Sequence, residues 1–280
     1  MDSRKASLSF EKAKCGGLYE GTMYTIIVNR LRTAGCVFAE DEARLLISAA
    51  MTPAELAAMV DRRVTGFPLE HIIGWTEFCG LRIAVGPGVF VPRYRTEFLV
   101  RQAAALTRPG AVVVDLCCGS GALGAVLAAM QERIELYASD IDPAAVQCAL
   151  QNVAAIGGRV YEGDLYEALP TILRGRVDVL VANTPYVPTE AIRLLPSEAR
   201  IHEARVAFDG GMDGLDIQRR VAAEASLWLA PGGHLLVETS ERQVSYTAEI
   251  FTRNGLIPRL ARSEELDATV VIGAKKISRG

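Results

Sequence analysis

The chain has 280 residues, 50% of them hydrophobic, and a formal net charge of -3 at pH 7. This length suits a main domain of about 200 residues with a smaller one beside it, and the charge argues against a general affinity for nucleic-acid phosphates. The cysteines and histidines lack zinc-ligand spacing, so we predict reduced thiols and no metal. Neither a signal peptide nor a membrane-spanning apolar run is present, which predicts a cytoplasmic protein without membrane contact.

The N-terminal part of the sequence is predicted to be a small helical domain over residues 1–74. Residues 1–18 are polar and irregular, and we expect them to be flexible. A helical pattern follows, with one helix beginning at Thr52-Pro53-Ala54-Glu55. Thr52 can cap this helix, Pro53 suits its first position and Glu55 can complete a capping box.

Residues 75–92 predict a β-hairpin that links this domain to the rest of the chain. Two runs typical of strands, 75–85 and 89–91, flank Gly86-Pro87-Gly88, which is typical of a turn. We therefore expect the second domain to cover residues 93–280.

Apolar strands alternate with helical stretches in the second domain. The predicted helices cover residues 122–132, 143–156 and 216–229. The predicted strands cover residues 111–116, 134–139, 159–161, 177–182, 234–238, 256–260 and 269–272. Nearly continuous apolar runs such as AVVVDL are typical of parallel strands that are buried on both faces. This alternation predicts an α/β fold with a doubly wound sheet.

A glycine-rich segment, Asp115-Leu-Cys-Cys-Gly119-Ser-Gly121-Ala-Leu-Gly124, follows the first of these strands and opens a helix. Its G-x-G-x-x-G spacing is compatible with NAD, with S-adenosylmethionine or with a bare tight turn. Asp115 favours S-adenosylmethionine, because a carboxylate at the strand end would repel a pyrophosphate but attract a sulfonium and an ammonium group. The glycines would let the backbone approach such a ligand closely.

Acidic residues also stand at the ends of the next two strands. Asp140 can accept both hydroxyls of a ribose, although it is also placed to begin a helix before Pro143. Asp164 can accept a hydrogen bond from the adenine amino group, with Leu165 as an apolar wall. Three acidic residues at three successive strand ends predict a nucleoside site.

The fourth strand ends in Asn183-Thr184-Pro185-Tyr186, which we expect at the same edge of the sheet. An amide nitrogen is a poor nucleophile, so an enzyme that methylates it must hold the planar amide in one orientation. The Asn183 carboxamide oxygen and a backbone carbonyl of this loop can each accept one amide N–H, and Tyr186 can pack on the flat face. The loop therefore predicts the substrate site, with transfer by in-line displacement.

These motifs resemble those of the protein-(glutamine-N5) methyltransferases, which modify release factors and ribosomal proteins. The resemblance extends over nearly the whole chain from about residue 20, including Pro68–Leu81, Val91–Glu97 and Glu203–Leu215. It implies a Rossmann-like, seven-stranded class I methyltransferase domain behind a helical substrate-recognition domain. It also implies S-adenosylmethionine as cofactor, a protein substrate, and catalysis by Asn183, Pro185 and Tyr186. The residues implied to line the cofactor are Cys117, Cys118, Gly119, Ser120, Gly121, Asp140, Leu165 and Asn183; those implied to hold the glutamine are Asn183, Thr184, Pro185 and Tyr186.

The chain departs from the family pattern at several positions. Thr184 replaces the first proline of the usual Asn-Pro-Pro-Tyr, and Cys117 stands where a glycine is common. Tyr94 and Arg95 replace the usual proline and acidic residue. These departures leave the cofactor prediction intact but leave the identity of the substrate protein open; a related subgroup of undetermined substrate is similar in having Asn-Thr-Pro-Tyr. The alternatives to methylation of a protein glutamine are methylation of an exocyclic amine of a nucleic acid, methylation of a small molecule, a non-catalytic cofactor-binding role and an NAD-dependent oxidoreductase. We expect a monomer and no direct contact with nucleic acid.

Overall fold

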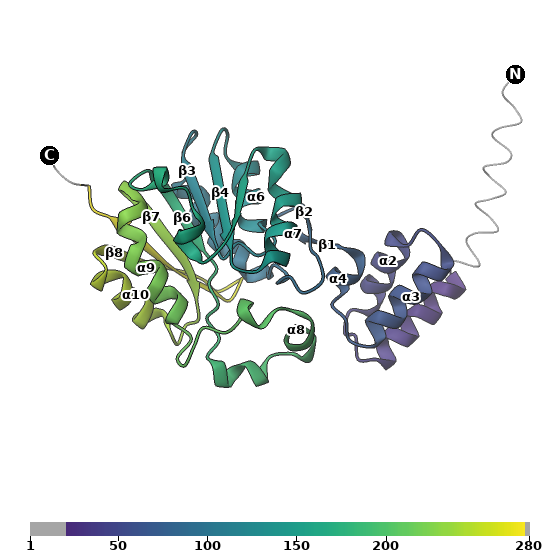
Figure 1. Ribbon diagram of the computed structural model, residues 1–280. Helices are drawn as coiled ribbons and strands as arrows, with labels where there is room; N and C mark the ends of the chain where they lie inside the picture. The colour runs from purple at the N-terminus through teal and green to yellow at the C-terminus, as the bar shows by residue number, and fades with distance from the viewer. Residues whose placement is uncertain (1–20, 278–280) are drawn as a thin grey trace, which may run out of the picture. The chain divides into compact units, whose positions relative to one another are not determined.

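The computed structural model describes residues 21–277 (Figure 1), so the expected flexible leader, residues 1–18, lies outside the described part. The chain divides into two compact units, Met1–Ile73 and Gly74–Gly280. Among the helices of residues 21–277, none is long and apolar enough to cross a membrane.

The first unit is helical throughout its described part. Residues 21–33 form its first helix. The others are α2 (Ala39–Ala49), α3 (Pro53–Val64) and α4 (Leu69–Ile73). Helix α3 begins as predicted, because the Thr52 hydroxyl accepts the Glu55 N–H at 3.1 Å and Pro53 takes the first helical position. Leu31, Leu46 and Val60 are buried in the core of this unit.

The second unit opens with a hairpin of β1 (Trp75–Phe78) and β2 (Leu81–Ala84). Its turn lies at Cys79-Gly80, within the first predicted run, so the prediction that residues 86–88 form the hairpin turn is wrong. Residues 86–89 do form a turn, in which the Val89 N–H donates to the Gly86 carbonyl at 3.2 Å, but this turn joins no pair of strands. Both residues of the hairpin turn, Cys79 and Gly80, have positive φ, 49° and 76°, which matches the right-handed twist of a two-residue hairpin loop. Residues 89–91 form no strand; instead, Val89 and Val91 pack with Val85 in a small buried cluster.

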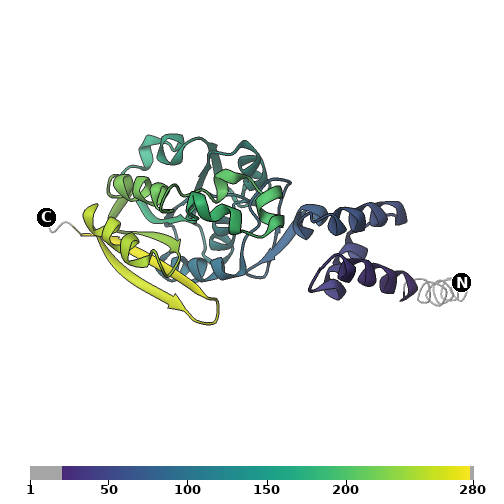
Figure 2. The ribbon, with the colours of Figure 1, turned by 90° about the horizontal axis from the view of Figure 1, so that it is seen from below.

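A seven-stranded sheet with the order β5-β4-β3-β6-β7-β9-β8 forms the centre of the second unit. Its strands are β3 (Val112–Leu116), β4 (Glu135–Asp140), β5 (Arg159–Glu162), β6 (Val177–Ala182), β7 (Leu229–Thr239), β8 (Leu256–Ser263) and β9 (Ala268–Lys275). Strands β3 to β7 run parallel, whereas β9 pairs antiparallel with both β7 and β8. All seven predicted strands are present, and the Rossmann-like fold is confirmed. The antiparallel pair β8 and β9, in yellow, is clear in Figure 2.

Helices cover the sheet on both faces, so β3 is buried along its whole length. They are α5 (Glu97–Leu106), α6 (Ala122–Met130), α7 (Pro143–Val153), α9 (Asp216–Trp228) and α10 (Val244–Arg253). The short helix α8 (Ser197–His202) lies away from the sheet, in a segment that lines the candidate site (Figure 1). Short 3-10 segments lie at Tyr94–Thr96, Ala154–Ile156, Leu165–Ala168, Thr171–Leu173, Thr189–Leu194 and Arg205–Ala207. Helices α5 and α6 pack on one face, where Leu99 and Val126 meet Val113; α9 and α10 pack on the other, where Trp228 and Phe251 belong to the core.

This arrangement positions the candidate site. Because β3, β4, β5 and β6 are neighbouring parallel strands, their carboxyl ends lie at one edge of the sheet, where open α/β folds bind ligands. The four loops that carry the predicted site residues therefore meet there.

Candidate active site

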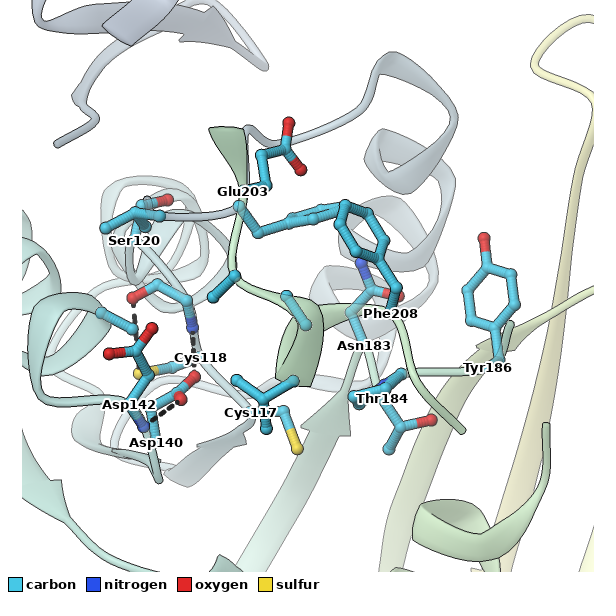
Figure 3. Close-up of a pocket in the computed structure, with 18 of the residues that line it drawn as sticks. Cys117, Cys118, Ser120, Asp140, Asp142, Asn183, Thr184, Tyr186, Glu203 and Phe208 are labelled. Carbon is cyan, nitrogen blue, oxygen red and sulfur yellow. Dashed lines mark hydrogen bonds between the residues drawn. The ribbon is translucent and has the colours of Figure 1, made fainter. Parts of the chain in front are cut away.

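A cavity of about 780 Å³ lies within the second unit, at the carboxyl edge of the parallel strands. Its walls come from the loops that follow β3, β4, β5 and β6, together with residues within 88–96 and 195–209. The side chains of Cys117, Asp140 and Asn183 lie close together around it (Figure 3). Residues that follow three separate strands therefore line one cavity, as the sequence predicts.

The loop after β3 approaches the cavity through an unusual backbone conformation. Cys117 and Gly119 have φ values of 54° and 55°, in the left-handed region that favours glycine. A non-glycine residue in this conformation costs about 1–2 kcal/mol, so the backbone at Cys117 is held there by the surrounding structure. A Cβ at Gly119 would meet nothing within 4 Å, so the loop faces open space at this residue. This leaves room for a ligand against the backbone.

Asp140, at the end of β4, holds this loop in place. One of its carboxylate oxygens accepts the Gly119 N–H at 2.8 Å, and the other accepts the Asp142 N–H at 3.0 Å (Figure 3). Burial raises the pKa of Asp140, and the backbone donors at Asp142 and Gly119 oppose that shift. Each oxygen has a second lone pair, so this carboxylate can still accept hydrogen bonds from a ligand.

The loop after β5 adds Asp164 and Leu165 to the wall of the cavity. Asp164 accepts a hydrogen bond from Arg220 of α9, with Nη2 and Oδ2 2.7 Å apart. Leu165 is 9% exposed and provides the expected apolar surface. The sequence did not identify Arg220, because a single arginine on an amphipathic helix has no distinguishing pattern.

Two predicted ligand contacts, Asp115 and Gly121, do not line the cavity. Asp115 is completely buried and accepts the Gly124 N–H at 3.0 Å, so it fixes the first turn of α6 from behind the loop. Burial raises its pKa to about 8; the Gly124 donor opposes this shift and the Asp140 charge adds to it. A Cβ on Gly121 would lie 3.0 Å from the Ala149 Cβ, so this glycine allows close packing against α7.

The two cysteines of the loop carry no sign of nucleophilic activation. Burial raises the pKa of both Cys117 and Cys118 well above its usual value, and the nearby charges of Asp140 and Asp115 raise it further. Both thiols are therefore protonated at neutral pH, and only the thiolate is a good nucleophile. This agrees with a reaction that forms no covalent enzyme intermediate.

All four residues of the loop after β6 line the same cavity. The Asn183 carboxamide oxygen and the Thr184 hydroxyl are buried and have no hydrogen-bond partner within the described part of the chain. A buried acceptor without a partner costs about 1–3 kcal/mol, so each of these atoms needs a partner that the described chain does not supply. In Figure 3 the Asn183 side chain lies beside Phe208, on the opposite side of the cavity from Ser120.

Tyr186 has a different environment from the one expected. Its ring stands to one side of Asn183, with the hydroxyl pointing away from the loop (Figure 3). That hydroxyl donates to Glu238 Oε1 at 3.1 Å and accepts from Arg95 Nη2 at 2.6 Å. Burial and the Glu238 charge raise the pKa of Tyr186 beyond its usual range. Tyr186 is thus a neutral, anchored side chain at the edge of the site.

Sequence reasoning missed a group of residues above the loop after β6. Phe90 and Phe208 form an edge-to-face pair with ring centroids 5.8 Å apart. Arg93 Nη2 donates to both carboxylate oxygens of Glu203, at 2.6 and 2.9 Å, and joins the two segments that carry these rings. These residues lie in irregular segments without a periodic pattern. The wider resemblance over Val91–Glu97 and Glu203–Leu215 includes Arg93, Glu203 and Phe208 but assigned them no role, and Phe90 lies outside it.

A mostly parallel seven-stranded sheet, a glycine loop after β3 and an acidic residue at the end of β4 define a Rossmann-like methyltransferase. A family model described as Methyltransferase small domain matches residues 81–211. A crystal structure of a methyltransferase from Pyrococcus furiosus has the same fold, with a TM-score of 0.55 at 18% identity over 71% of this chain and 91% of that one.

Curated relatives show the family. The chain is 36% identical over 230 residues to the release factor glutamine methyltransferase of Geobacter sulfurreducens, covering 80% of each protein. It is also 36% identical over 203 residues to the 4-amino-L-phenylalanine/4-methylamino-L-phenylalanine methyltransferase of Streptomyces pristinaespiralis, covering 70% of this chain and 69% of that protein. The chain belongs to the release factor glutamine methyltransferase family and is an S-adenosylmethionine-dependent enzyme.

Proposed function

We propose that the protein methylates the side-chain amide nitrogen of a glutamine in a peptide chain release factor. The observation that carries this proposal is the Asn183 carboxamide oxygen, a buried acceptor without a partner in residues 21–277, in the same cavity as the glycine loop. Several relatives that share 34–39% identity with the chain are named as release factor glutamine methyltransferases, which supports this choice of substrate.

The residues present suit S-adenosylmethionine. The open space at Gly119 fits the amino-acid part of the cofactor, the remaining lone pairs of Asp140 fit the ribose hydroxyls, and Leu165 fits the adenine face. Asp164 and Arg220 then lie at the adenine edge of the site. When bound, the cofactor supplies an electrophilic methyl group on a sulfonium, which is a good leaving group.

The role of the loop after β6 is orientation. Asn183 Oδ1 accepts one N–H of the substrate amide, and a backbone carbonyl of the loop accepts the other. Two acceptors fix the plane of the amide and direct its nitrogen at the methyl group. Such positioning is a large contribution to catalysis when the leaving group is already good. The proton lost from the nitrogen can pass to water, because an N-protonated amide is a strong acid and needs no strong base.

The helical first unit is the proposed recognition domain for the substrate protein. A release factor must present its glutamine to the cavity, and the second unit already supplies both the cofactor loop and the loop after β6. The first unit would then add affinity for the rest of the substrate.

The test is incubation of the purified protein and methyl-labelled S-adenosylmethionine with a bacterial lysate, followed by mass spectrometry of labelled peptides. The expected label is on a glutamine of a release factor, within a Gly-Gly-Gln sequence. An Asn183→Ala variant serves as the inactive control, and Arg101→Met, which changes an exposed residue away from the cavity, serves as the active control. Label confined to RNA, or methylation of 4-amino-L-phenylalanine without any labelled protein, would overturn the proposal.

A further inference from the structure

A cluster of Arg95, Tyr186 and Glu238 lies at the edge of the cavity and connects three separate segments of the second unit. Arg95 Nη2 donates to the Tyr186 hydroxyl at 2.6 Å, and that hydroxyl donates to Glu238 Oε1 at 3.1 Å. Arg95 Nε also lies 3.3 Å from the same Glu238 oxygen. Arg95 and Tyr186 line the cavity, whereas Glu238 lies behind them at the end of β7.

In this Arg95–Tyr186–Glu238 cluster, Arg95 supplies the positive charge that the buried Glu238 carboxylate requires. Glu238 is 2% exposed, and its second oxygen has no partner in the described chain. A buried carboxylate requires a cation or several hydrogen bonds, and Arg95 is the cation that contacts Glu238 here. The planar guanidinium can contact two partners from one fixed geometry, which an ammonium group cannot do equally well.

Tyr186 is held at both its ends. Gln243 Nε2 donates to the Tyr186 backbone carbonyl at 3.0 Å and to the Asp213 carbonyl at 2.9 Å. The cluster with Arg95 then fixes the hydroxyl end of the same residue. Between Tyr186 and Asn183 the chain contains Pro185, whose ring fixes its φ angle. A constraint on Tyr186 is therefore transmitted to the Asn183 side chain through a short and stiff segment.

We propose that Arg95 is a positioning residue, which together with Glu238 fixes Tyr186 and so sets the orientation of Asn183 toward the acceptor. The part of this inference that concerns an acceptor amide rests on the proposed function; the part that concerns the order of the loop does not.

The first test is hydrogen exchange of the loop, measured by mass spectrometry on peptides that cover residues 183–187. Arg95→Met should speed this exchange about tenfold, the effect of losing one charge-assisted hydrogen bond. Arg101→Met is the matched control: Arg101 is also half-exposed and pairs with Glu97 at 3.3 Å, but it does not line the cavity. Its exchange over these residues should equal that of the wild type. No acceptor is needed, so failure of the proposed function leaves this test intact.

The second test separates positioning from general support of the fold. With a purified release factor as acceptor, Arg95→Met should lower kcat about tenfold or more, while KM changes less than about twofold. The dissociation constant of S-adenosylmethionine, measured by calorimetry, should stay the same. Arg95→Lys should recover part of kcat. In a Tyr186→Phe background, Arg95→Met should cost less than about twofold, because the two side chains act together.

Arg95→Met alone leaves Glu238 buried without a cation, so a double variant, Arg95→Met with Glu238→Gln, tests the same contacts in a neutral pair. It should fold, and should show the same faster exchange and lower kcat. Wild-type exchange over residues 183–187 in both Arg95→Met variants would overturn the inference. So would an equal loss of kcat with and without the Tyr186 hydroxyl.

Discussion

Substitution of Asp140 by alanine should weaken cofactor binding through the loss of the contacts that hold the glycine loop. The Asp140 carboxylate accepts the Gly119 N–H at 2.8 Å and the Asp142 N–H at 3.0 Å. Hydrogen bonds to a charged group contribute about 1.5–3 kcal/mol each, so the pair accounts for at least about 3 kcal/mol. Since about 1.4 kcal/mol corresponds to a factor of ten, the dissociation constant should rise about 100-fold or more.

Isothermal calorimetry with S-adenosylhomocysteine measures this dissociation constant without any acceptor. Asp178→Ala provides the matched control: the Asp178 carboxylate also accepts a backbone N–H, that of Val112 at 2.8 Å, but at the opposite end of the sheet. The control should bind the ligand as the wild type does, even if its melting temperature falls. An Asp140→Ala variant that binds within about threefold of the wild type would refute the role given to this carboxylate.

Three further predictions concern other parts of the site. Asn183→Ala should lower methyl transfer about 100-fold by loss of orientation, with the melting temperature and circular dichroism unchanged; near-normal turnover would refute its role. Burial raises the pKa of Asp115 from 3.8 to about 8, so the folded state keeps a proton that the unfolded chain releases, and stability falls as pH rises between these values. Asp115→Asn should therefore gain stability over the wild type by at most about 1.4 kcal/mol per pH unit in that window; a constant difference in thermal unfolding from pH 5 to 8 would contradict this. A Cβ at Gly214 would lie 2.3 Å from the Tyr186 carbonyl oxygen and 2.5 Å from Gln243 Nε2, so Gly214→Ala should reduce both stability and transfer, as thermal unfolding and a labelling assay would show.

The part of the site that could be predicted from the sequence is the part built on strand ends. Parallel strands buried on both faces have continuous apolar runs, and their carboxyl ends meet at one edge of the sheet. The positions of Asp140, Asp164 and Asn183 follow from this rule, and all three line one cavity. The same rule placed Asp115 beside the ligand, but its side chain points to the start of α6 instead.

The rest of the site depends on irregular segments that have no periodic pattern. Arg93 and Glu203 pair across 110 residues of sequence, and Phe90 meets Phe208 across a similar distance, so only the folded chain shows these contacts. The contact between the half-exposed Arg95 and the buried Glu238 is of the same kind. The hairpin turn was misplaced because Gly86-Pro87-Gly88 is the stronger local turn sequence, whereas Cys79 adopts a positive φ that few non-glycine residues adopt.

A crystal structure of the protein with S-adenosylhomocysteine bound would measure the spatial relation on which the mechanism depends. We predict that the ribose lies against Asp140, that the adenine lies against Leu165, and that the sulfur faces the Asn183 carboxamide across the cavity. A ligand bound at another edge of the sheet, or a sulfur atom directed away from residues 183–186, would contradict the account.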